Sequence, residues 1–288
     1  MSARARSRAG PWLLVLPGGL WLAAFFVVPM VMLLSLSLQT GSLEEGFTLT
    51  WHFGTYLDAI RLYHVQFVRS ILYGGVVTLI TLVLAYPMAY WIAFYGGRRK
   101  STYLFLILLP FFVSFVIRTV SWEFILSDQG ILLGPLKRLH LLPAGFHALA
   151  TPYAVIGGLT YNFLPFMALP LYVALERIDH SLVEAASDLY ASKVQAFLRV
   201  ILPLSIPGIF AGVLLTFVPA ASDFVNAAIL GGPGTTMIGN VIQTEFLVNN
   251  DYPLASAMSF VLMAALLIGV FAYARALGTE DVLEVSAA

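Results

Sequence analysis

The chain has 288 residues, of which 60% are hydrophobic and 10% are charged, and its formal net charge is zero. Soluble globular domains carry about 25% charged residues, so this composition and a mean hydropathy of +0.89 predict an integral membrane protein. The balanced charge provides no global attraction to nucleic acid. The absence of cysteine excludes disulfides, thiolate metal ligands and a thiol nucleophile.

Six apolar stretches each supply the ~20 residues that a helix needs to cross a bilayer. They cover residues 12–38, 67–95, 102–126, 151–175, 205–230 and 254–276. The first stretch is longer than the apolar core of a signal peptide, which favours a retained span. We therefore predict an all-α integral membrane fold with six transmembrane helices, in a single domain covering residues 1–288.

Lysine and arginine predict the orientation, because cytoplasmic loops carry an excess of these residues. With six spans both termini face the same side, together with ten basic residues: Arg4, Arg6, Arg8, Arg98, Arg99, Lys100, Arg177, Lys193, Arg199 and Arg275. Five remain for the other side: Arg61, Arg69, Arg118, Lys137 and Arg138. We therefore expect both termini and the loop at residues 176–204 to be cytoplasmic.

No segment of the chain predicts catalysis or metal binding. Residues 231–236 (Gly-Gly-Pro-Gly-Thr-Thr) are rich in glycine, but they lack the lysine of a Walker A loop and are better interpreted as a turn. The five histidines do not stand at metal-ligand spacing from a carboxylate. We expect no catalytic residue and no metal site, so the energy for any transport would come from another subunit or from an ion gradient.

Asp223 is predicted to lie late in the fifth span, where a carboxylate is costly and usually faces a polar pathway or a partner. Pro219, four residues earlier, removes one helical hydrogen bond. Asn226 follows three residues later, on the same helical face. The alternative interpretation is an aspartate already at the outer membrane interface.

Other polar side chains mark the third and fourth spans. Trp122 shares a helical face with Arg118, and Glu123 is predicted either to line a path or to pair with Arg118. Tyr161 and Asn162 precede a proline in the fourth span. The alternatives are an interfacial aromatic belt and ordinary helix packing. Carboxylates with aromatic rings would suit an organic cation, and the candidate translocation path comprises Asp223, Asn226, Glu123, Trp122, Tyr161 and Asn162.

The loop at residues 176–204 is longer than a connection between two spans requires. Ser181 and Glu184 have capping-box spacing, and apolar residues follow at helical intervals. A second short helix over residues 194–201 is predicted to stop at Pro203. The apolar faces of these helices must be buried against one of three surfaces: the lipid interface, the ends of the chain's own helices, or a partner protein.

This loop resembles the EAA loop of ABC-importer permeases, in which Glu-Ala-Ala-x-x-x-Gly precedes a hydrophobic-Leu-Pro sequence. In that family the loop is a coupling helix that docks on a cytoplasmic ATPase. The resemblance implies a coupling loop formed by Glu184, Ala185, Ala186, Asp188, Leu189, Tyr190, Ala191, Phe197, Leu202 and Pro203. Tyr190 stands where the family has glycine. A left-handed tyrosine costs about 1 kcal/mol or more, so we expect a reshaped turn.

Residues 100–276 also resemble the spermidine/putrescine importer permeases. The segments that carry this resemblance are Arg118-Thr-Val-Ser-Trp122, Tyr161–Tyr172, Glu176-Arg-Ile-Asp179, Asp223-Phe-Val, Leu230-Gly-Gly, Ile238-Gly-Asn-Val-Ile242 and Phe246–Pro253. The resemblance implies a type I ABC-importer permease subunit of a bacterial inner membrane, which moves polyamines by ATP-driven alternating access.

The same resemblance implies the partners: a second homologous permease, two ATPase subunits that bind ATP and Mg, and an extracytoplasmic substrate-binding protein. The chain itself would be embedded in the lipid bilayer and would hold no cofactor. Two alternatives remain open. One is an importer permease for another small solute, and the other, from a different class, is an ion-coupled secondary transporter.

Overall fold

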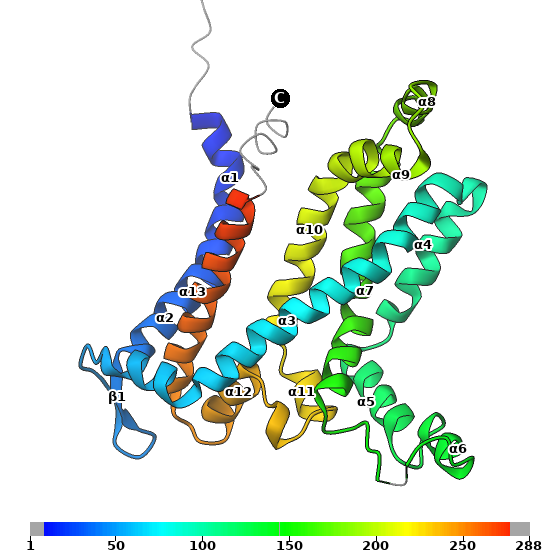
Figure 1. Cartoon of the computed structure of the whole chain (residues 1–288). Helices are drawn as coiled ribbons and strands as arrows, with labels where there is room; N and C mark the ends of the chain where they lie inside the picture. The colour runs from blue at the N-terminus through cyan, green and yellow to red at the C-terminus, as the bar shows by residue number, and fades with distance from the viewer. Residues whose placement is uncertain (1–8, 144, 277–288) are drawn as a thin grey trace, which may run out of the picture. The chain divides into compact units, whose positions relative to one another are not determined.

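The computed structural model describes residues 9–143 and 145–276, and most of this part is helical (Figure 1). The α-helices are α1 (Ala9–Leu22), α2 (Val28–Ser37), α3 (Gly54–Tyr95), α4 (Lys100–Leu108), α5 (Phe115–Leu126), α6 (Leu133–Arg138), α7 (Pro152–Glu176), α8 (His180–Asp188), α9 (Lys193–Ala196), α10 (Leu202–Ala221), α11 (Val225–Ile229), α12 (Ile238–Leu247) and α13 (Tyr252–Ala276). Arg4, Arg6 and Arg8, used to predict the orientation, lie outside the described residues.

The chain forms two compact units. Within the described part, the first unit contains the residues up to Leu62 together with Ile242–Val261, and the second contains Tyr63–Val241 and the residues from Leu262 onward. Tyr63 breaks the helical backbone inside α3, with φ −120° and ψ 18°. The first unit also holds an antiparallel hairpin of β1 (Gln39–Ser42) and β2 (Gly46–Leu49), which the sequence did not predict.

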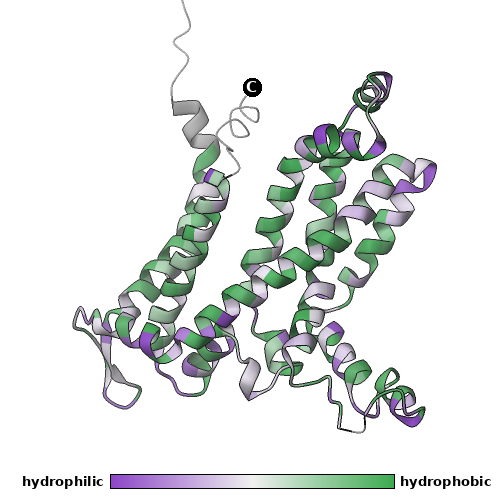
Figure 2. Cartoon of the chain, viewed as in Figure 1, coloured by the Kyte–Doolittle hydropathy of each residue, from purple (hydrophilic) through white to green (hydrophobic). Residues whose placement is uncertain are grey.

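Five helical stretches have the length and apolarity to cross a membrane: Val15–Ser37, Gly54–Tyr95, Pro152–Glu176, Lys193–Ala221 and Tyr252–Ala276. Figure 2 shows hydrophobic residues along the long helices and hydrophilic ones at their ends and connections. A sixth stretch is broken, because Gly97–Phe112 and Phe115–Leu126 meet at 88°. The prediction of one continuous third span over residues 102–126 is therefore wrong.

The break in the third span has a local cause. Pro110 lies in the short 3₁₀ helix η3 (Leu109–Phe112), and Val113 after it is extended, with φ −92° and ψ 140°. A 3₁₀ turn at the end of a helix is tighter than an α-turn, and an extended residue cannot continue the helical ladder. The chain therefore leaves one helix and restarts at Phe115 in a new direction.

The fifth span differs from the prediction at both ends. Pro203 does not stop the helix, because the π-helical turn η4 (Phe197–Ile201) leads directly into α10. In this turn the Leu202 N–H bonds to the Phe197 carbonyl, five residues back. Such a wide turn accommodates a proline that has no N–H to donate. At the other end the helix finishes at Ala221, so Asp223 lies beyond it rather than inside it.

Close packing of α7 against α10 forms the centre of the second unit. A Cβ atom on Gly208 would lie 2.8 Å from the Pro170 carbonyl oxygen and 3.3 Å from the Leu171 Cα. A Cβ atom on Gly212 would lie 2.7 Å from the Met167 Sδ. Small residues of this kind let membrane helices approach closely, which replaces the hydrophobic effect as the source of their association.

We expect Gly208→Leu to destabilise the second unit by about 1–3 kcal/mol or more, because the new side chain has no space between α7 and α10. The melting temperature of the detergent-purified protein measures this. Gly75→Leu in α3 is the matched control, since a Cβ atom there meets nothing within 4 Å. Equal melting temperatures for the two variants would contradict the packing described here.

Candidate functional site

The predicted coupling loop forms two short helices at one end of the second unit, α8 and α9, which we call the arm (residues 179–201; Figure 1). Asp179, rather than Ser181, caps α8, because its Oδ1 accepts the Ser181 backbone N–H at 2.9 Å. This bond holds the pKa of the Asp179 carboxyl below its ordinary value. The capping box is also displaced: Ser192 and Gln195 form it at the start of α9. The prediction of a Ser181–Glu184 box is wrong.

Tyr190 keeps the left-handed geometry that glycine has in the family motif, with φ +59°. Its N–H bonds to the Ser187 carbonyl at 3.0 Å, and the Ala191 N–H bonds to the Ala186 carbonyl at 3.0 Å. These two bonds are the Schellman pattern at a helix C-terminus. The expectation of a reshaped turn is therefore wrong. The turn keeps its geometry, with Tyr190 in a left-handed conformation that is strained for this residue type.

Much of the apolar surface of the arm faces away from the chain. Val183 and Phe197 pack on a core cluster around Met167, Leu171 and Ile201. Leu189 and Tyr190, however, are 82% and 97% exposed. Of the predicted coupling residues, Ala186, Ala191, Phe197 and Leu202 are half-buried, and the exposed ones are Glu184, Ala185, Asp188, Leu189, Tyr190 and Pro203. An exposed apolar patch of this kind is typical of a protein interaction site.

The base of the arm is tied to neighbouring helices. Lys100 Nζ at the start of α4 binds both carboxylate oxygens of Glu176 at the end of α7, at 2.8 and 2.9 Å. The ring of Phe94 lies 5.0 Å from that of His180 in an edge-to-face arrangement. Tyr86 contacts the Phe197 ring at 5.6 Å and bonds through its hydroxyl to Ser205 Oγ at 2.9 Å. The arm therefore contacts α3 directly, and α3 and α4 are bonded to α10 and α7 beside it.

A second polar centre lies at the opposite end of α7, where α5, α7 and α11 meet. Asn162 Nδ2 donates to Thr119 Oγ1 at 3.2 Å and to Asn226 Oδ1 at 3.0 Å. Asn226 in turn donates to Asp223 Oδ1, from its backbone N–H at 2.8 Å and from Nδ2 at 3.1 Å. We call these four residues the polar junction.

The polar junction corrects the interpretation of Asp223. The sequence placed Asp223 and Asn226 on the same face of the fifth span, but α10 ends at Ala221, before both residues, and Asp223 caps the first turn of α11. All four side chains are buried. The sequence did not single out Thr119, because a threonine in a span usually bonds only to its own helix. Thr119 Oγ1 does donate to the Phe115 carbonyl of its own helix, at 3.0 Å, but it also accepts from Asn162.

The remaining predicted path residues lie nearby on α5 and α7. The Trp122 and Tyr161 rings are 5.4 Å apart in an edge-to-face arrangement. Glu123 is half-buried and makes no hydrogen bond or ion pair within residues 9–143 and 145–276. It does not pair with Arg118, one of the two alternatives. The structure therefore brings Asp223, Asn226 and Asn162 together and leaves Glu123 apart from them.

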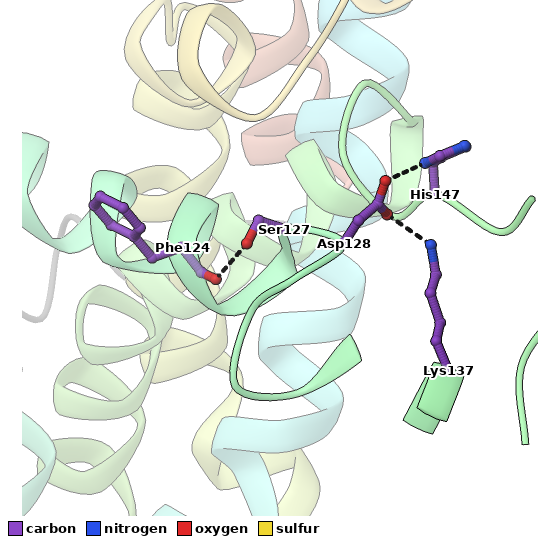
Figure 3. Close-up of polar contacts among 5 residues, drawn as sticks. All are labelled: Phe124, Ser127, Asp128, Lys137 and His147. Atoms are coloured by element: carbon purple, nitrogen blue, oxygen red, sulfur yellow. Dashed lines mark hydrogen bonds and ion pairs between the residues drawn. The ribbon is translucent and has the colours of Figure 1, made fainter. Parts of the chain in front are cut away.

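A third cluster of polar side chains cross-links residues within the segment between α5 and α7. Figure 3 shows the Asp128 carboxylate between Lys137 Nζ, at 2.9 Å, and His147 Nδ1, at 2.6 Å, while Ser127 Oγ donates to the Phe124 carbonyl. The hydrogen bond from Lys137, followed by that from His147, holds the pKa of Asp128 below its ordinary value. Among the described residues, no group of three or more histidine, aspartate and glutamate side chains is placed to hold a metal ion.

The spans, together with the exposed arm and the buried polar junction, define an integral membrane protein. Residues 67–277 match the family described as the inner membrane component of binding-protein-dependent transport systems. The chain belongs to this family. The solved structures support the same fold, that of type I ABC-importer permeases. They include a bacterial ABC transporter involved in alginate import (TM-score 0.70, 20% identity, 93% of this chain and 95% of that one) and the MetNI methionine ABC transporter (TM-score 0.58, 16% identity, 76% and 98%).

Curated relatives are permease subunits rather than enzymes. The spermidine/putrescine transport system permease protein PotB of Haemophilus influenzae is 39% identical over 259 residues, which cover 89% of this chain and 90% of the relative. PotB of Escherichia coli K12 is 36% identical over 257 residues, covering 89% and 94%. The inner membrane ABC transporter permease protein YdcU of the same organism is 34% identical over 230 residues, covering 75% and 72%.

We expect Asn226→Ala to lower the stability of the second unit by about 1–3 kcal/mol, because it leaves the buried Asp223 carboxylate without its side-chain donor and removes one of the two acceptors of Asn162. Asp223→Asn should cost less, since an amide oxygen still accepts the Asn226 backbone N–H. Melting temperatures measure both changes. Ser121→Ala is the control, because this exposed hydroxyl bonds only to its own helix. An Asn226→Ala protein that melts like Ser121→Ala would show that the junction contributes nothing.

We expect Asp128→Asn to raise hydrogen exchange at Lys137 and His147 by a few-fold at most, because exposed ion pairs contribute little. Since the pKa of Asp128 is lowered in the fold, the pair is fully present above the ordinary aspartate pKa of about 3.9 and is lost only as the pH falls below it. Exchange at Lys137 in the wild type, corrected for intrinsic rates, should therefore be the same at pH ~5 and pH ~7, because Lys137 pairs with the ionised Asp128 carboxylate at both. Ser127→Ala should leave exchange unchanged.

Proposed function

We propose that this chain is the permease subunit of a binding-protein-dependent ABC importer for polyamines, spermidine or putrescine, which it moves by ATP-driven alternating access. The exposed apolar surface of the arm carries the proposal, because a connection between two spans needs no such surface. Relatives that cover 89% of the chain at 36–39% identity and bear the name spermidine/putrescine permease support the solute class.

The arm is proposed to receive the ATPase. Leu189, Tyr190 and Val194 form an apolar patch that a groove on a partner would bury, and Glu184 and Asp188 lie beside it on exposed positions. The Schellman turn at Tyr190 fixes the angle at which α8 meets the partner. The distribution of lysine and arginine supports a cytoplasmic position for the arm and for both termini.

The complete importer would contain a second homologous permease, two ATPase subunits that bind ATP and Mg, and an extracytoplasmic substrate-binding protein. The family description, which specifies a binding-protein-dependent system, supports the last of these. One solved transporter of the same fold was captured with a periplasmic protein bound to an alginate pentasaccharide. The chain itself would hold no cofactor and carry out no hydrolysis.

The candidate path would use its residues at different stages. Glu123, Trp122 and Tyr161 are half-buried, so a cationic solute could reach the carboxylate and the two rings. Asp223, Asn226 and Asn162 are enclosed and bonded to one another. They would meet solute only after α5, α7 and α11 separate. Rocking of packed helices between discrete arrangements is the usual basis of such access changes.

We expect Ala185→Asp, which places a buried charge in the proposed interface, to reduce ATP-dependent uptake of labelled spermidine to background while the protein still inserts. Glu184→Ala should give the same loss. Proteoliposomes with the full importer measure uptake, and membrane abundance measures insertion. Ser187→Ala is the control on the same helix, because its hydroxyl bonds only to the Val183 carbonyl.

Three outcomes would contradict parts of the proposal in different ways. Normal uptake by Ala185→Asp would show that the arm does not couple ATP hydrolysis to transport. Uptake driven by an ion gradient without the ATPase would favour the secondary transporter. Binding of a solute other than a polyamine by the partner binding protein would keep the importer but change its substrate. Isothermal titration of that binding protein with spermidine and putrescine distinguishes this last case.

A further inference from the structure

A groove lies between α3 and α4, at the end of the second unit that carries the arm (Figure 1). Its volume is about 460 Å³, and side chains within residues 87–92 of α3 and 103–107 of α4 line it. All of these side chains are apolar or aromatic. The rings of Trp91 and Tyr103, one from each helix, meet edge to face with their centres 5.0 Å apart. Such a lining suits a hydrocarbon segment, because a polar solute would find few partners in it.

Both helices that form the groove belong to stretches able to cross a membrane, so the groove opens toward lipid. Met88, Trp91 and Leu106 line it and are all exposed in this chain. Trp91 and Tyr103 also lie about one turn from the ends of their helices. Tryptophan and tyrosine concentrate where the membrane meets water. This end of the groove therefore lies at the level of the lipid headgroups.

The turn that joins α3 to α4 places positive charge at this end of the groove. Arg98 and Arg99 are exposed there, and neither side chain makes a hydrogen bond or an ion pair within residues 9–143 and 145–276. Lys100, the next residue, differs because the Glu176 carboxylate neutralises it. An exposed arginine needs no partner in water, so the apolar groove beside the two arginines carries the argument and their exposure does not.

Backbone hydrogen bonds hold the arginines next to the groove. The carbonyl of Ile92, whose side chain lines the groove, accepts the Gly96 N–H at 3.1 Å. The Gly96 carbonyl in turn accepts the Arg99 N–H at 3.0 Å. The apolar wall and the positive turn are therefore parts of one continuous site. Charge at one end of an apolar surface is complementary to an amphiphile with an anionic head.

We propose that this groove binds an acyl chain of an anionic phospholipid whose phosphate is held by Arg98 and Arg99. A guanidinium pairs with a phosphate through two parallel hydrogen bonds, and basic pockets beside membrane helices attract anionic headgroups. The acyl chain occupies the apolar wall between Met88 and Leu106. This inference goes beyond the proposed function, because it requires an integral membrane protein but neither a polyamine nor an ATPase.

A lipid fits the site better than a protein segment. The charge is confined to one end and the groove itself is apolar, whereas a protein interface combines polar and apolar contacts over its whole area. The arm lies at the same end, because Lys100 binds Glu176 at its base. An arm in the cytoplasm therefore places the bound lipid in the inner leaflet, where anionic lipids give the membrane a negative surface potential.

The headgroup contact is tested by native mass spectrometry of the detergent-purified full importer, titrated with phosphatidylglycerol or with phosphatidylcholine of the same acyl chains. Arg98→Gln and Arg99→Gln should each weaken phosphatidylglycerol binding about 5-fold, and together about 30-fold, because each basic residue near an anionic headgroup contributes on this scale. Phosphatidylcholine binding should change less, since its headgroup has no net charge. Arg138→Gln is the matched control, because Arg138 is an exposed arginine on α6.

The acyl-chain contact is tested by filling the groove. Leu106→Trp should weaken the binding of both lipids about 10-fold, as expected when about two methylene groups lose their burial. Leu79→Trp is the matched control, because it makes the same change at an exposed position of α3 outside the groove. Melting temperatures without added lipid check that both variants fold. If Leu106→Trp does not accumulate in the membrane, Met88→Trp makes the same test from the other helix.

Four results would overturn the proposal. Phosphatidylglycerol binding that is equal in the double variant of Arg98 and Arg99 and in Arg138→Gln would remove the headgroup site. Lipid binding that is equal in Leu106→Trp and Leu79→Trp would remove the groove as the acyl-chain site. Displacement of the lipid by an equal concentration of inorganic phosphate would identify a free anion as the occupant. Loss of the ATPase from the double variant, with lipid binding unchanged, would assign the two arginines to a protein contact. None of these results bears on the importer function, which the uptake measurements test separately.

Discussion

The close contact between α7 and α10 is the constraint on which the rest of the second unit depends. Gly208 and Gly212 remove the side chains that would separate the two helices, at positions where they face Pro170 and Met167. In a membrane, such packing supplies the stability that hydrophobic burial supplies in water. Because the arm connects the end of α7 to the start of α10, its position follows directly from this contact.

The same pair of helices links two distant polar regions. At one end, aromatic contacts of Phe94 and Tyr86 hold the arm to α3, and Lys100 of α4 pairs with Glu176 at the end of α7. At the other end, the polar junction holds the short helix α11 against α5 and α7. Under the proposed function, a displacement of the arm by an ATPase would have to reach the polar junction through this helix pair.

The polar groups inside the membrane fall into two kinds. Asn162, Asn226 and Asp223 find partners within the chain, so they stabilise one arrangement of the broken helices. Arg118 does not, although it lies beside Thr119, a member of the polar junction. The contrast matters because unsatisfied groups in a membrane are costly. The bonded groups hold the broken helices of the second unit in one arrangement.

The sequence by itself determined the class of this protein and the place of the arm. Apolar stretches of membrane-spanning length, and the motif from Glu184 to Pro203, are local features that need no knowledge of packing. Only the tertiary structure decided where helices break. Pro110 and Pro203 have the same missing N–H, yet the chain bends at the first, where an extended Val113 follows, and continues through the second, where a π-turn precedes it. Whether a proline bends a helix depends on how its neighbours satisfy the freed carbonyls. For the same reason the polar junction became visible only when α5, α7 and α11 were brought together.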